Sequence, residues 1–207
     1  MAVVRSLDRI VMASSNPGKL REFSALLMPL GIELISQTQL GIGDAKEPYA
    51  TFVENALAKA RHASRESGLP ALADDSGICV EALGGAPGVR SARYAPLPSG
   101  GRDDEANNAF LLEQLQNAAS RRAHYACVLV LVRSADDPQP LIAEGNWFGE
   151  VIDQRRGDGG FGYDPYFLLP DLGKTAAELS AEHKNRISHR GQAMRELVAK
   201  LGGAGLA

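Results

Sequence analysis

The sequence predicts an α/β protein with a mixed β-sheet, and three observations support this class. Strand-like and helix-like patterns alternate along the 207 residues, without an internal repeat or a low-complexity linker. Two strand-like segments, 125–133 and 141–152, are separated by an Asp-Asp-Pro turn, which is typical of an antiparallel pair. With 44% hydrophobic and 23% charged residues, residues 1–207 are expected to form a single domain, or two closely packed lobes.

Composition also excludes several classes of protein. The longest apolar run, 126–132, is much shorter than the roughly 20 residues needed to cross a bilayer. The N-terminal segment is interrupted early by charged residues, so neither a secretory signal nor membrane association is expected. The two cysteines, Cys79 and Cys127, lie in apolar surroundings, which favours buried thiols in a reducing cytoplasm over a disulfide scaffold.

The net charge and the histidines limit the partners of the protein. A formal charge of -3 lacks the basic excess that a broad nucleic-acid surface needs, so no nucleic acid is expected and any phosphate site must be local. The four histidines are dispersed and match no zinc-ligand spacing, so a zinc site is not expected.

The first predicted elements are a strand, a helix and a second strand. Segment 9–13 reads as a strand that ends in the polar turn Ser14–Lys19. Asn16 can cap the following helix and Pro17 suits its first turn. That helix has a regular apolar face, made by Leu20, Phe23, Leu27 and Leu30. Segment 32–36 then reads as the second strand.

The next elements lie around an acidic segment. Thr51 and Glu54 have capping-box spacing, and the alanine-rich helix over 55–67 is expected to end at Gly68. Residues 74–77 are interpreted as a turn between the apolar segments 69–73 and 78–80. The glycine-rich stretch 84–88 reads as a loop, and 106–115 reads as a helix.

The last predicted elements follow the antiparallel pair. Glycines at 157–162 are expected to interrupt the sheet before a strand over 163–169. A helix over 188–201, ended by Gly202, is expected to close the chain.

Asp74 and Asp75 are the most informative polar residues. Adjacent buried carboxylates repel each other, and each costs several kcal/mol unless it is paired or bound to a metal. Together with Glu47 they have the oxygen ligands that magnesium prefers, with water and phosphate in its other positions. The alternative is that Asp74 caps a turn while Asp75 and Glu47 are solvated.

The turn Ser14–Lys19 joins a strand to a helix start and has the character of a phosphate cradle. Such a turn presents backbone N–H groups, the positive end of the helix dipole and a lysine. It is not a P-loop, because only Gly18-Lys19 of that motif is present and Leu20 replaces the metal-binding hydroxyl. The alternative is an ordinary capped turn.

Two further clusters suggest ligand contacts. The glycines around Phe161, Tyr163 and Asp164 allow a flat ligand to approach closely, although a β-bulge with two core aromatics explains them equally well. Lys184 with segment 188–190 places hydrogen-bond donors around a helix start, and the alternative there is a solvated basic face.

Taken together, these clusters resemble a known family, the non-canonical purine nucleoside triphosphate pyrophosphatases, also called inosine/xanthosine triphosphate pyrophosphatases. The resemblance spans nearly the whole chain. It rests on six strings in the order of the family: Ser-Asn-Pro-Gly-Lys at 15–19, Thr-Phe-Val-Glu-Asn-Ala at 51–56, Ala-Asp-Asp-Ser-Gly at 73–77, Gly-Gly-Ala-Pro-Gly-Val-Arg-Ser-Ala-Arg-Tyr at 84–94, Gly-Phe-Gly-Tyr-Asp-Pro at 160–165 and Ile-Ser-His-Arg-Gly-Gln-Ala at 187–193.

The resemblance implies an elongated mixed sheet with flanking helices, two lobes around a central substrate cleft, and a homodimer. It implies hydrolysis of ITP, dITP and XTP to the nucleoside monophosphate and pyrophosphate, with Mg2+. Asp75 would be the general base and a metal ligand, and Glu47 a second metal ligand. The substrate contacts that it implies are Ser14, Ser15, Asn16, Pro17, Gly18, Lys19, Ser76, Phe161, Gly162, Tyr163, Asp164, Lys184, His189 and Arg190.

The implied base preference follows from hydrogen bonding. Hypoxanthine and xanthine carry a 6-oxo acceptor where adenine carries a donor. Donors from Lys184, His189, Arg190 or the backbone of 161–164 would therefore favour the deaminated purines. Two other readings stay open: a pyrophosphatase with a different base preference, and a non-catalytic nucleotide-binding module.

Overall fold

A computed structural model describes residues 7–98 and 101–203 of the chain. It is a mixed α/β protein, as predicted. Its strands are β1 (Arg9–Met12), β2 (Glu33–Ser36), β3 (Ala71–Val80), β4 (Arg122–Val132), β5 (Leu141–Val151), β6 (Phe167–Leu169) and β7 (Lys174–Thr175). Its α-helices are α1 (Pro17–Leu27), α2 (Phe52–Ser67), α3 (Asp104–Gln114), α4 (Ala181–Ile187) and α5 (His189–Gly203).

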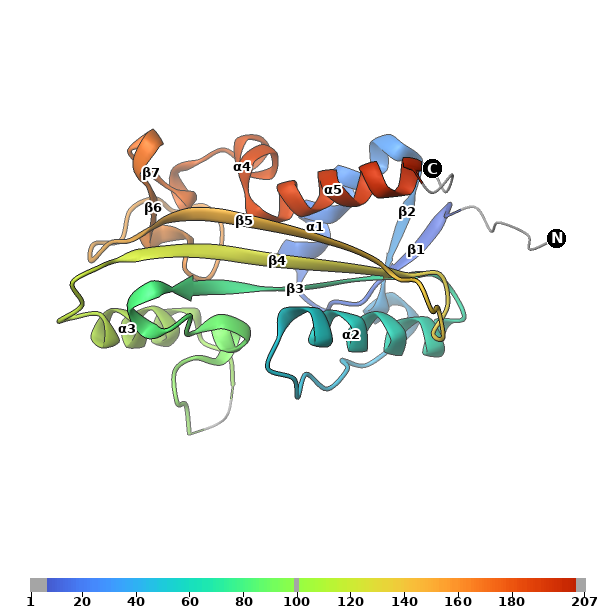
Figure 1. Ribbon diagram of the computed structural model, residues 1–207, viewed down its shortest axis with the longest axis horizontal. Coiled ribbons are helices and arrows are strands. Elements are labelled where there is room, and N and C mark those ends of the chain that lie inside the picture. Colours follow the sequence, from blue (N-terminus) through green and yellow to red (C-terminus); the bar gives the residue numbers. More distant parts are fainter. Residues whose placement is uncertain (1–6, 99–100, 204–207) are drawn as a thin grey trace. The chain divides into compact units, whose positions relative to one another are not determined.

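The strands form a mixed sheet in the order β2-β1-β3-β4-β5-β6-β7 (Figure 1). Strand β1 is parallel to β2 and β3, whereas β6 is antiparallel to β5 and β7. The N–H of Val151, at the end of β5, donates to the carbonyl of Arg121, just before β4, at 2.9 Å. This bond joins the end of one strand to the start of the other, which confirms the predicted antiparallel pair.

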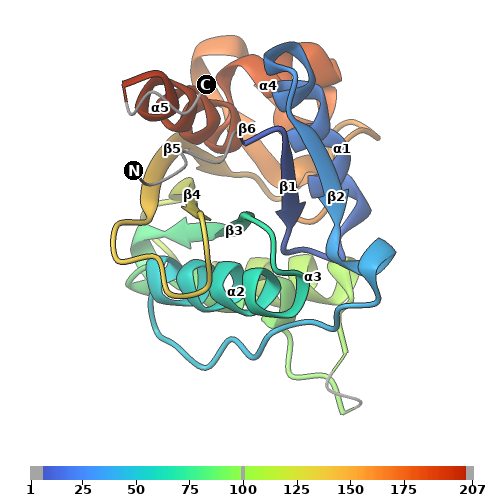
Figure 2. The ribbon, with the colours of Figure 1, turned by 90° about the vertical axis from the view of Figure 1, so that its right-hand side faces the viewer.

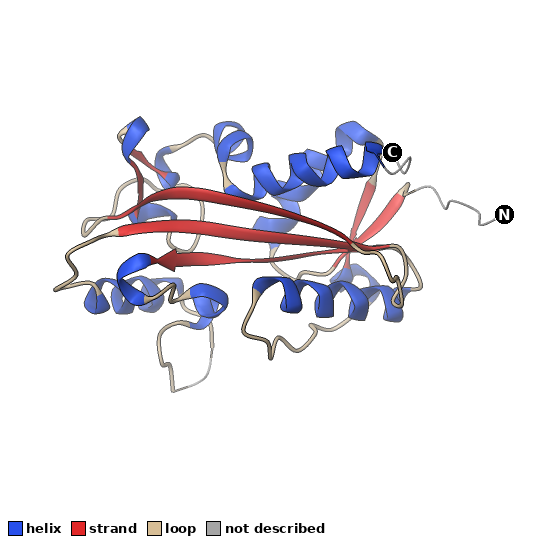
Figure 3. Ribbon diagram, in the orientation of Figure 1, coloured by secondary structure: helices blue, strands red, loops and turns tan. Residues whose placement is uncertain are grey.

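The chain divides into two compact units. Of the described residues, unit 1 contains 7–75, 127–145 and 190–203, and unit 2 contains 76–98, 101–126 and 146–189. The three longest strands, β3, β4 and β5 (Figure 3), contribute residues to both units.

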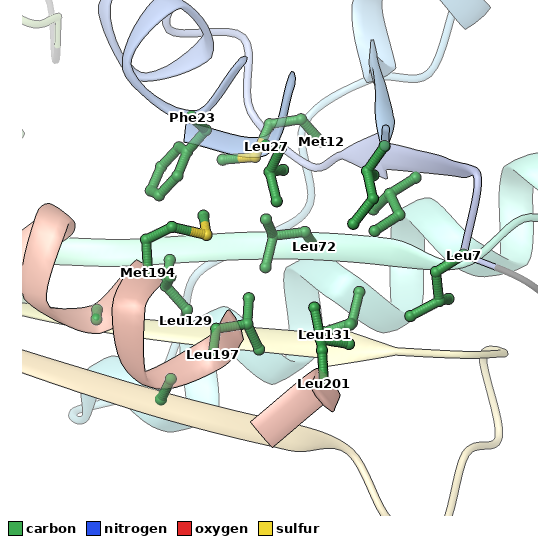
Figure 4. Packing of buried hydrophobic residues seen from close by; sticks show 14 of the residues in the cluster. Leu7, Met12, Phe23, Leu27, Leu72, Leu129, Leu131, Met194, Leu197 and Leu201 are labelled. Atoms are coloured by element: carbon green, nitrogen blue, oxygen red, sulfur yellow. The ribbon is translucent and has the colours of Figure 1, made fainter. Parts of the chain in front are cut away.

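Unit 1 has helices on both faces of its strands, with α2 on one face and α1 and α5 on the other (Figure 2). Successive side chains of a strand point to opposite faces, so each strand supplies both layers. From β1, Val11 packs on the α2 side and Met12 on the α1/α5 side. The α1/α5 layer is large and apolar (Figure 4), and its labelled members are Leu7, Met12, Phe23, Leu27, Leu72, Leu129, Leu131, Met194, Leu197 and Leu201.

Local sequence explains the ends of the helices in unit 1. The side chain of Asn16 accepts hydrogen bonds from the N–H groups of Gly18 and Lys19, which confirms it as the cap of α1. Thr51 caps α2 by accepting from the Glu54 N–H at 3.4 Å. Gly68 ends α2 with a left-handed backbone (φ +69°) that glycine adopts at little cost.

Unit 2 has its own core between α3 and the strand residues of 76–80, 122–126, 147–151 and 167–169. The core is rich in aromatic side chains: Tyr125 lies edge-on to Phe167 with ring centroids 4.7 Å apart, and Trp147 lies 5.5 Å from Phe167. Tyr163 also belongs to this core, and its hydroxyl donates to the carbonyl of Ser91 at 2.8 Å. Ile78 of β3, Leu111 of α3 and Leu115, just after α3, belong to the same core.

The structure corrects three predictions of secondary structure. Residues 74–77 are not a turn but lie inside β3, because cations neutralise the two carboxylates and the strand therefore runs on. Residues 164–166 form a short 3-10 helix rather than a strand, since Pro165 cannot supply an N–H to a sheet and the Tyr166 N–H donates to the Tyr163 carbonyl. The helix α4 was not predicted; its seven residues are too few to show a clear apolar period.

The two cysteines differ in burial: Cys127 is buried, as predicted, whereas Cys79 is half-buried. Cys79 and Cys127 are free thiols on β3 and β4. None of the helices in the described ranges, 7–98 and 101–203, is long and apolar enough to span a bilayer.

Phe23 makes the packing of the α1/α5 layer testable. Its side chain is fully buried, so Phe23→Ala removes a large contact and leaves a cavity. We expect the free energy of unfolding, measured by urea denaturation, to fall by about 3–5 kcal/mol. Met28, just after α1, is 74% exposed, and Met28→Ala is the control, with an expected change within about 0.5 kcal/mol. Equal losses in the two variants would contradict this packing.

Candidate active site

The polar residues of unit 1 are organised by the alternation of β3. Asp74 and Asp75 are adjacent and both buried, with only 1% and 7% of their surfaces exposed. Because neighbouring side chains of a strand point to opposite faces, the two carboxylates lie on opposite faces of β3. Asp74 points toward α1 and α5, and Asp75 points toward α2. The two aspartates therefore have separate partners.

Asp74 binds two cations. Its Oδ2 atom lies 3.2 Å from Lys19 Nζ and 3.0 Å from Arg190 Nε. Arg190 continues the network to α1, since its Nη1 donates to Glu22 Oε2 at 3.0 Å. The other Asp74 oxygen, Oδ1, accepts from the Cys127 thiol at 3.6 Å. Asp74 thus holds the first turn of α1 against the first turn of α5.

Burial and the neighbouring charges shift the pKa values of Asp74 and Lys19. Burial opposes the charged form of Asp74, but Lys19 and Arg190 outweigh it and lower the pKa of that carboxyl well below its ordinary value. Burial also lowers the pKa of Lys19, and Asp74 opposes this effect. An ammonium group that is poorly solvated and shares its counter-ion with Arg190 is well suited to bind a further anion.

Asp75 lies in a different cluster, with two residues of α2 and one from the preceding loop. Lys59 Nζ donates to Asp75 Oδ1 at 2.8 Å and to Glu47 Oε1 at 2.7 Å. Asn55 Nδ2 reaches Asp75 Oδ2 at 3.4 Å and also bonds the carbonyl of Tyr49. One ammonium group therefore holds two carboxylates together, one buried and one at the surface.

The pKa values in this cluster shift in the direction that a general base requires. Burial raises the pKa of Asp75, and Lys59 only partly opposes this. Burial acts to lower the pKa of Lys59, but Asp75 and Glu47 outweigh it, so the ammonium form is favoured. A carboxylate whose pKa is raised in this way is a stronger proton acceptor than a solvated aspartate.

The contacts of Lys59 and Asn55 with Asp75 were not predicted from the sequence. A signal was present, because positions 55 and 59 are four residues apart on a predicted helix and so share one face. What could not be read from the sequence is that this face lies against the Asp75 side of β3. The alternative in which Asp75 is solvated is wrong, since Asp75 is buried.

Asp75 and Glu47 fit a magnesium ion in the chemistry of their donors. Both place a carboxylate oxygen within 2.8 Å of the same positive centre, the Lys59 ammonium, so the two groups converge. Within the ranges 7–98 and 101–203, no group of three or more His, Cys, Asp or Glu side chains is arranged to hold a metal. A cation held here would therefore complete its octahedral shell with water and phosphate oxygens, as magnesium commonly does. Asp74 is already committed to Lys19 and Arg190.

The turn Ser14–Lys19 differs from its prediction in one respect. The expected unbonded amides are engaged: the Asn16 N–H donates to Ser14 Oγ, and the N–H groups of Gly18 and Lys19 donate to Asn16 Oδ1. Ser15 Oγ donates to Asp44 at 3.1 Å. The side chain of Asn16 caps the helix and so competes for the donors that a phosphate would use. The cation that this turn contributes is Lys19, which is paired with Asp74.

The candidate residues of unit 2 surround Asp164. Its Oδ2 atom accepts from Lys184 Nζ at 2.7 Å and from the Phe161 N–H at 2.8 Å. Its Oδ1 atom accepts from the Tyr125 hydroxyl at 3.3 Å. Gly160 permits this arrangement, because a Cβ there would lie 2.1 Å from Asp164 Oδ2. The aspartate thus ties residues 157–162, called the glycine-rich loop from here on, to α4.

This arrangement places a cation against an aromatic ring. Lys184 Nζ lies 5.0 Å from the centre of the Phe161 ring, within the range of a cation–π contact. The backbone of the loop is less available than expected, because the N–H groups of Phe161, Gly162 and Asp164 all have acceptors within the protein. As donors to a base these three amides stay a prediction, in which a ligand would compete with acceptors of the protein itself. What the loop contributes is the Phe161 ring.

The segment 188–190 is buried. Ser188, His189 and Arg190 are each at most 5% exposed and Lys184 is 6% exposed, so the alternative of a solvated basic face is wrong. The His189 ring is stacked on Tyr125, with 4.7 Å between centroids and 9° between planes. Ser76, the last predicted contact, is half-buried in β3.

Comparison with known proteins assigns the chain to a class. Residues 10–200 match the Ham1 family, and the chain belongs to that family. This confirms the family resemblance that the sequence motifs indicated.

Individual relatives are more specific. The chain is 70% identical to the dITP/XTP pyrophosphatase of Ralstonia nicotianae over 94% of this chain and 97% of that protein. It is 64% identical to the dITP/XTP pyrophosphatase of Bordetella pertussis, over 97% and 94% of the two chains. Among solved structures, the HAM1 protein from Coxiella burnetii superposes with a TM-score of 0.86 at 47% identity, over 94% of this chain and 98% of that one.

Asp74→Asn tests the buried ion group. The amide removes the charge that balances Lys19 and Arg190, and breaking such a buried pair typically costs about 3–5 kcal/mol. We expect urea denaturation at pH 7 to show a loss of this size.

The pH dependence of that loss has a definite sign. Since the pKa of Asp74 is lowered by folding, its contribution to stability is complete above the unfolded value near 3.9 and is lost as the pH falls further. The difference between the wild type and Asp74→Asn should therefore be constant from about pH 5 to 7 and shrink below about pH 4. A gap that grows on acidification would contradict the ion group.

Proposed function

We propose that this protein hydrolyses dITP, ITP and XTP to the nucleoside monophosphate and pyrophosphate. The curated relatives named above carry the name dITP/XTP pyrophosphatase at 64–70% identity over nearly the whole chain, which supports this substrate class. The observation that carries the mechanism is the Asp75–Lys59–Glu47 cluster, in which a buried carboxylate of raised pKa lies beside a second carboxylate.

In the proposed reaction, Asp75 accepts a proton from the attacking water. The water oxygen forms a bond to the α phosphorus, and the bond from that phosphorus to the oxygen bridging the α and β phosphates breaks. Pyrophosphate leaves with the electron pair of that bond. Lys59 keeps Asp75 and Glu47 close despite their like charges, and Asn55 fixes the second oxygen of Asp75.

Mg2+ is the proposed cofactor, held by Asp75 and Glu47. When bound there it neutralises charge on the phosphate oxygens. The chain's own part is to bring two carboxylate oxygens to one point through Lys59.

The triphosphate is proposed to bind the cations of unit 1. Lys19 is the principal donor, because its ammonium is desolvated and shares Asp74 with Arg190. The remaining residues of the turn, Ser14 to Gly18, hold Lys19 in place through the Asn16 cap. Ser76, next to Asp75 on β3, is proposed as a further substrate contact.

The purine base is proposed to bind residues of unit 2. Phe161 offers a ring face for stacking, and Lys184 and His189 supply donors for the 6-oxo group, with Gly162, Tyr163 and Asp164 shaping the loop. A site built for such hydrogen bonds rejects an analogue that lacks the acceptor, by up to about 10,000-fold, because its donors are left unpaired. Arg190, which is paired with Asp74, is proposed to add positive charge to the substrate site.

The family resemblance also supports a homodimer located in the cytoplasm. The two free thiols, Cys79 and Cys127, are consistent with a reducing compartment.

Product analysis tests the proposed function. We expect the purified protein, with Mg2+ and ITP, to release IMP and pyrophosphate in equal amounts, and to consume ATP and GTP far more slowly. Nucleotide separation and a pyrophosphate assay measure both products. Release of IDP and phosphate would mean attack at the γ phosphorus, and no turnover of any triphosphate would leave a binding protein.

Asp75→Asn tests the general base. A positioned base contributes about 100- to 10,000-fold, so we expect kcat for ITP to fall by that factor. Asp136→Asn, an exposed aspartate in the turn between β4 and β5, is the matched control and should keep full activity. Circular dichroism should show the same fold in both variants. Full activity of Asp75→Asn would exclude the proposed role.

Metal removal and Glu47→Gln test the proposed cofactor. EDTA should abolish turnover and Mg2+ should restore it. Loss of one carboxylate ligand should raise the Mg2+ concentration for half-maximal activity by at least about 10-fold, the effect known even for groups that only support a ligand. Glu66→Gln, an exposed position on α2, is the control. An unchanged Mg2+ requirement in Glu47→Gln would remove Glu47 from the site.

A further inference from the structure

Two side chains of helix α3 bind the backbone of Gly162 in the glycine-rich loop. The carboxylate of Asp104 accepts from the Gly162 N–H at 2.9 Å, and the side-chain amide of Asn108 donates to the Gly162 carbonyl at 2.9 Å. Asp104 and Asn108 are four residues apart, so they lie on one face of α3. Both polar groups of the Gly162 backbone are therefore bound by the same helix.

The orientation of Asn108 is determined by its surroundings. Its Nδ2 atom donates to two carbonyl oxygens, those of Gly162 and of Asp104 at 2.8 Å, so the nitrogen must face them. Only 7% of the residue is exposed, and water therefore has little access to these bonds. Asp104 is half-buried and also accepts from Arg102 Nε at 3.1 Å.

The hydrogen bonds from α3 fix the backbone conformation of Gly162. Gly162 has a left-handed backbone (φ +62°), and it follows directly after Phe161. The conformation of Gly162 decides the direction in which the chain leaves Phe161. The other side of Phe161 is fixed by its own N–H, which donates to Asp164. The ring is thus held between two anchored peptide groups, one bound by Asp164 and one by α3.

We infer that Asp104 and Asn108 are positioning residues that hold the Phe161 ring in the orientation that stacks on a purine base. The inference rests on the proposed function, because it assigns Phe161 to the base. Neither residue lies in the strings that carry the family resemblance. They act on the affinity for the nucleotide through the loop, not on the proton transfer at Asp75.

Asp104→Ala is the central variant. Loss of a hydrogen bond to a charged group should raise KM for ITP by about 10-fold, while kcat changes little. Hydrogen exchange of a peptide that covers residues 159–166 should become faster, because the Gly162 N–H loses its acceptor. Asp104→Asn keeps an acceptor oxygen and should recover most of the wild-type KM. Glu105→Ala, an exposed acid in the same helical turn, is the matched control and should behave like the wild type.

The outcomes separate this inference from the proposed function. A wild type that does not turn over ITP overturns the proposed function, and the inference with it. With an active wild type, the inference alone fails if Asp104→Ala has the KM of Glu105→Ala, if Asp104→Asn is as impaired as Asp104→Ala, or if exchange of the loop is unchanged. An Asp104→Ala variant whose KM rises while kcat and the melting temperature match those of Glu105→Ala supports it.

Discussion

Two adjacent aspartates, buried on opposite faces of β3, are the constraint on which the rest of unit 1 depends. Asp74 and Asp75 can both remain charged only because each face supplies its own cations, Lys19 and Arg190 on one side and Lys59 on the other. The strand alternation that divides the hydrophobic core into two layers also divides the charges. The fold and the candidate chemistry therefore have the same origin.

This division explains why adjacent residues of one chemical type have different roles. Asp74 has a lowered pKa and is paired with two cations, Lys19 from α1 and Arg190 from α5, so its role is to hold the first turns of these helices together. Asp75 has a raised pKa and faces a second carboxylate across Lys59, which suits a proton acceptor and metal ligand. In unit 2, Asp164 is a third arrangement, in which one carboxylate anchors a loop, a lysine and a tyrosine.

Sequence patterns predicted the helices and strands better than they predicted which residues lie next to each other in the fold. Local signals, Asn16 before Pro17 and Gly68 after the alanine-rich helix, placed the start of α1 and the end of α2 correctly because capping acts over a few residues. The acidic segment was taken for a turn because the cations that neutralise it come from distant helices. Lys59 and Asp104 were missed for the same reason, since their partners lie 16 and 58 positions away.

The proposed mechanism depends most on which phosphorus atom the water attacks, and isotope labelling identifies this atom directly. Turnover of ITP in water enriched in oxygen-18, followed by mass spectrometry of both products, identifies the phosphorus that receives the oxygen. If Asp75 activates a water at the α phosphorus, the phosphate of IMP will carry one labelled oxygen and pyrophosphate will carry none. Label in pyrophosphate would mean attack at the β phosphorus and would contradict the assignment of Asp75 and its cluster.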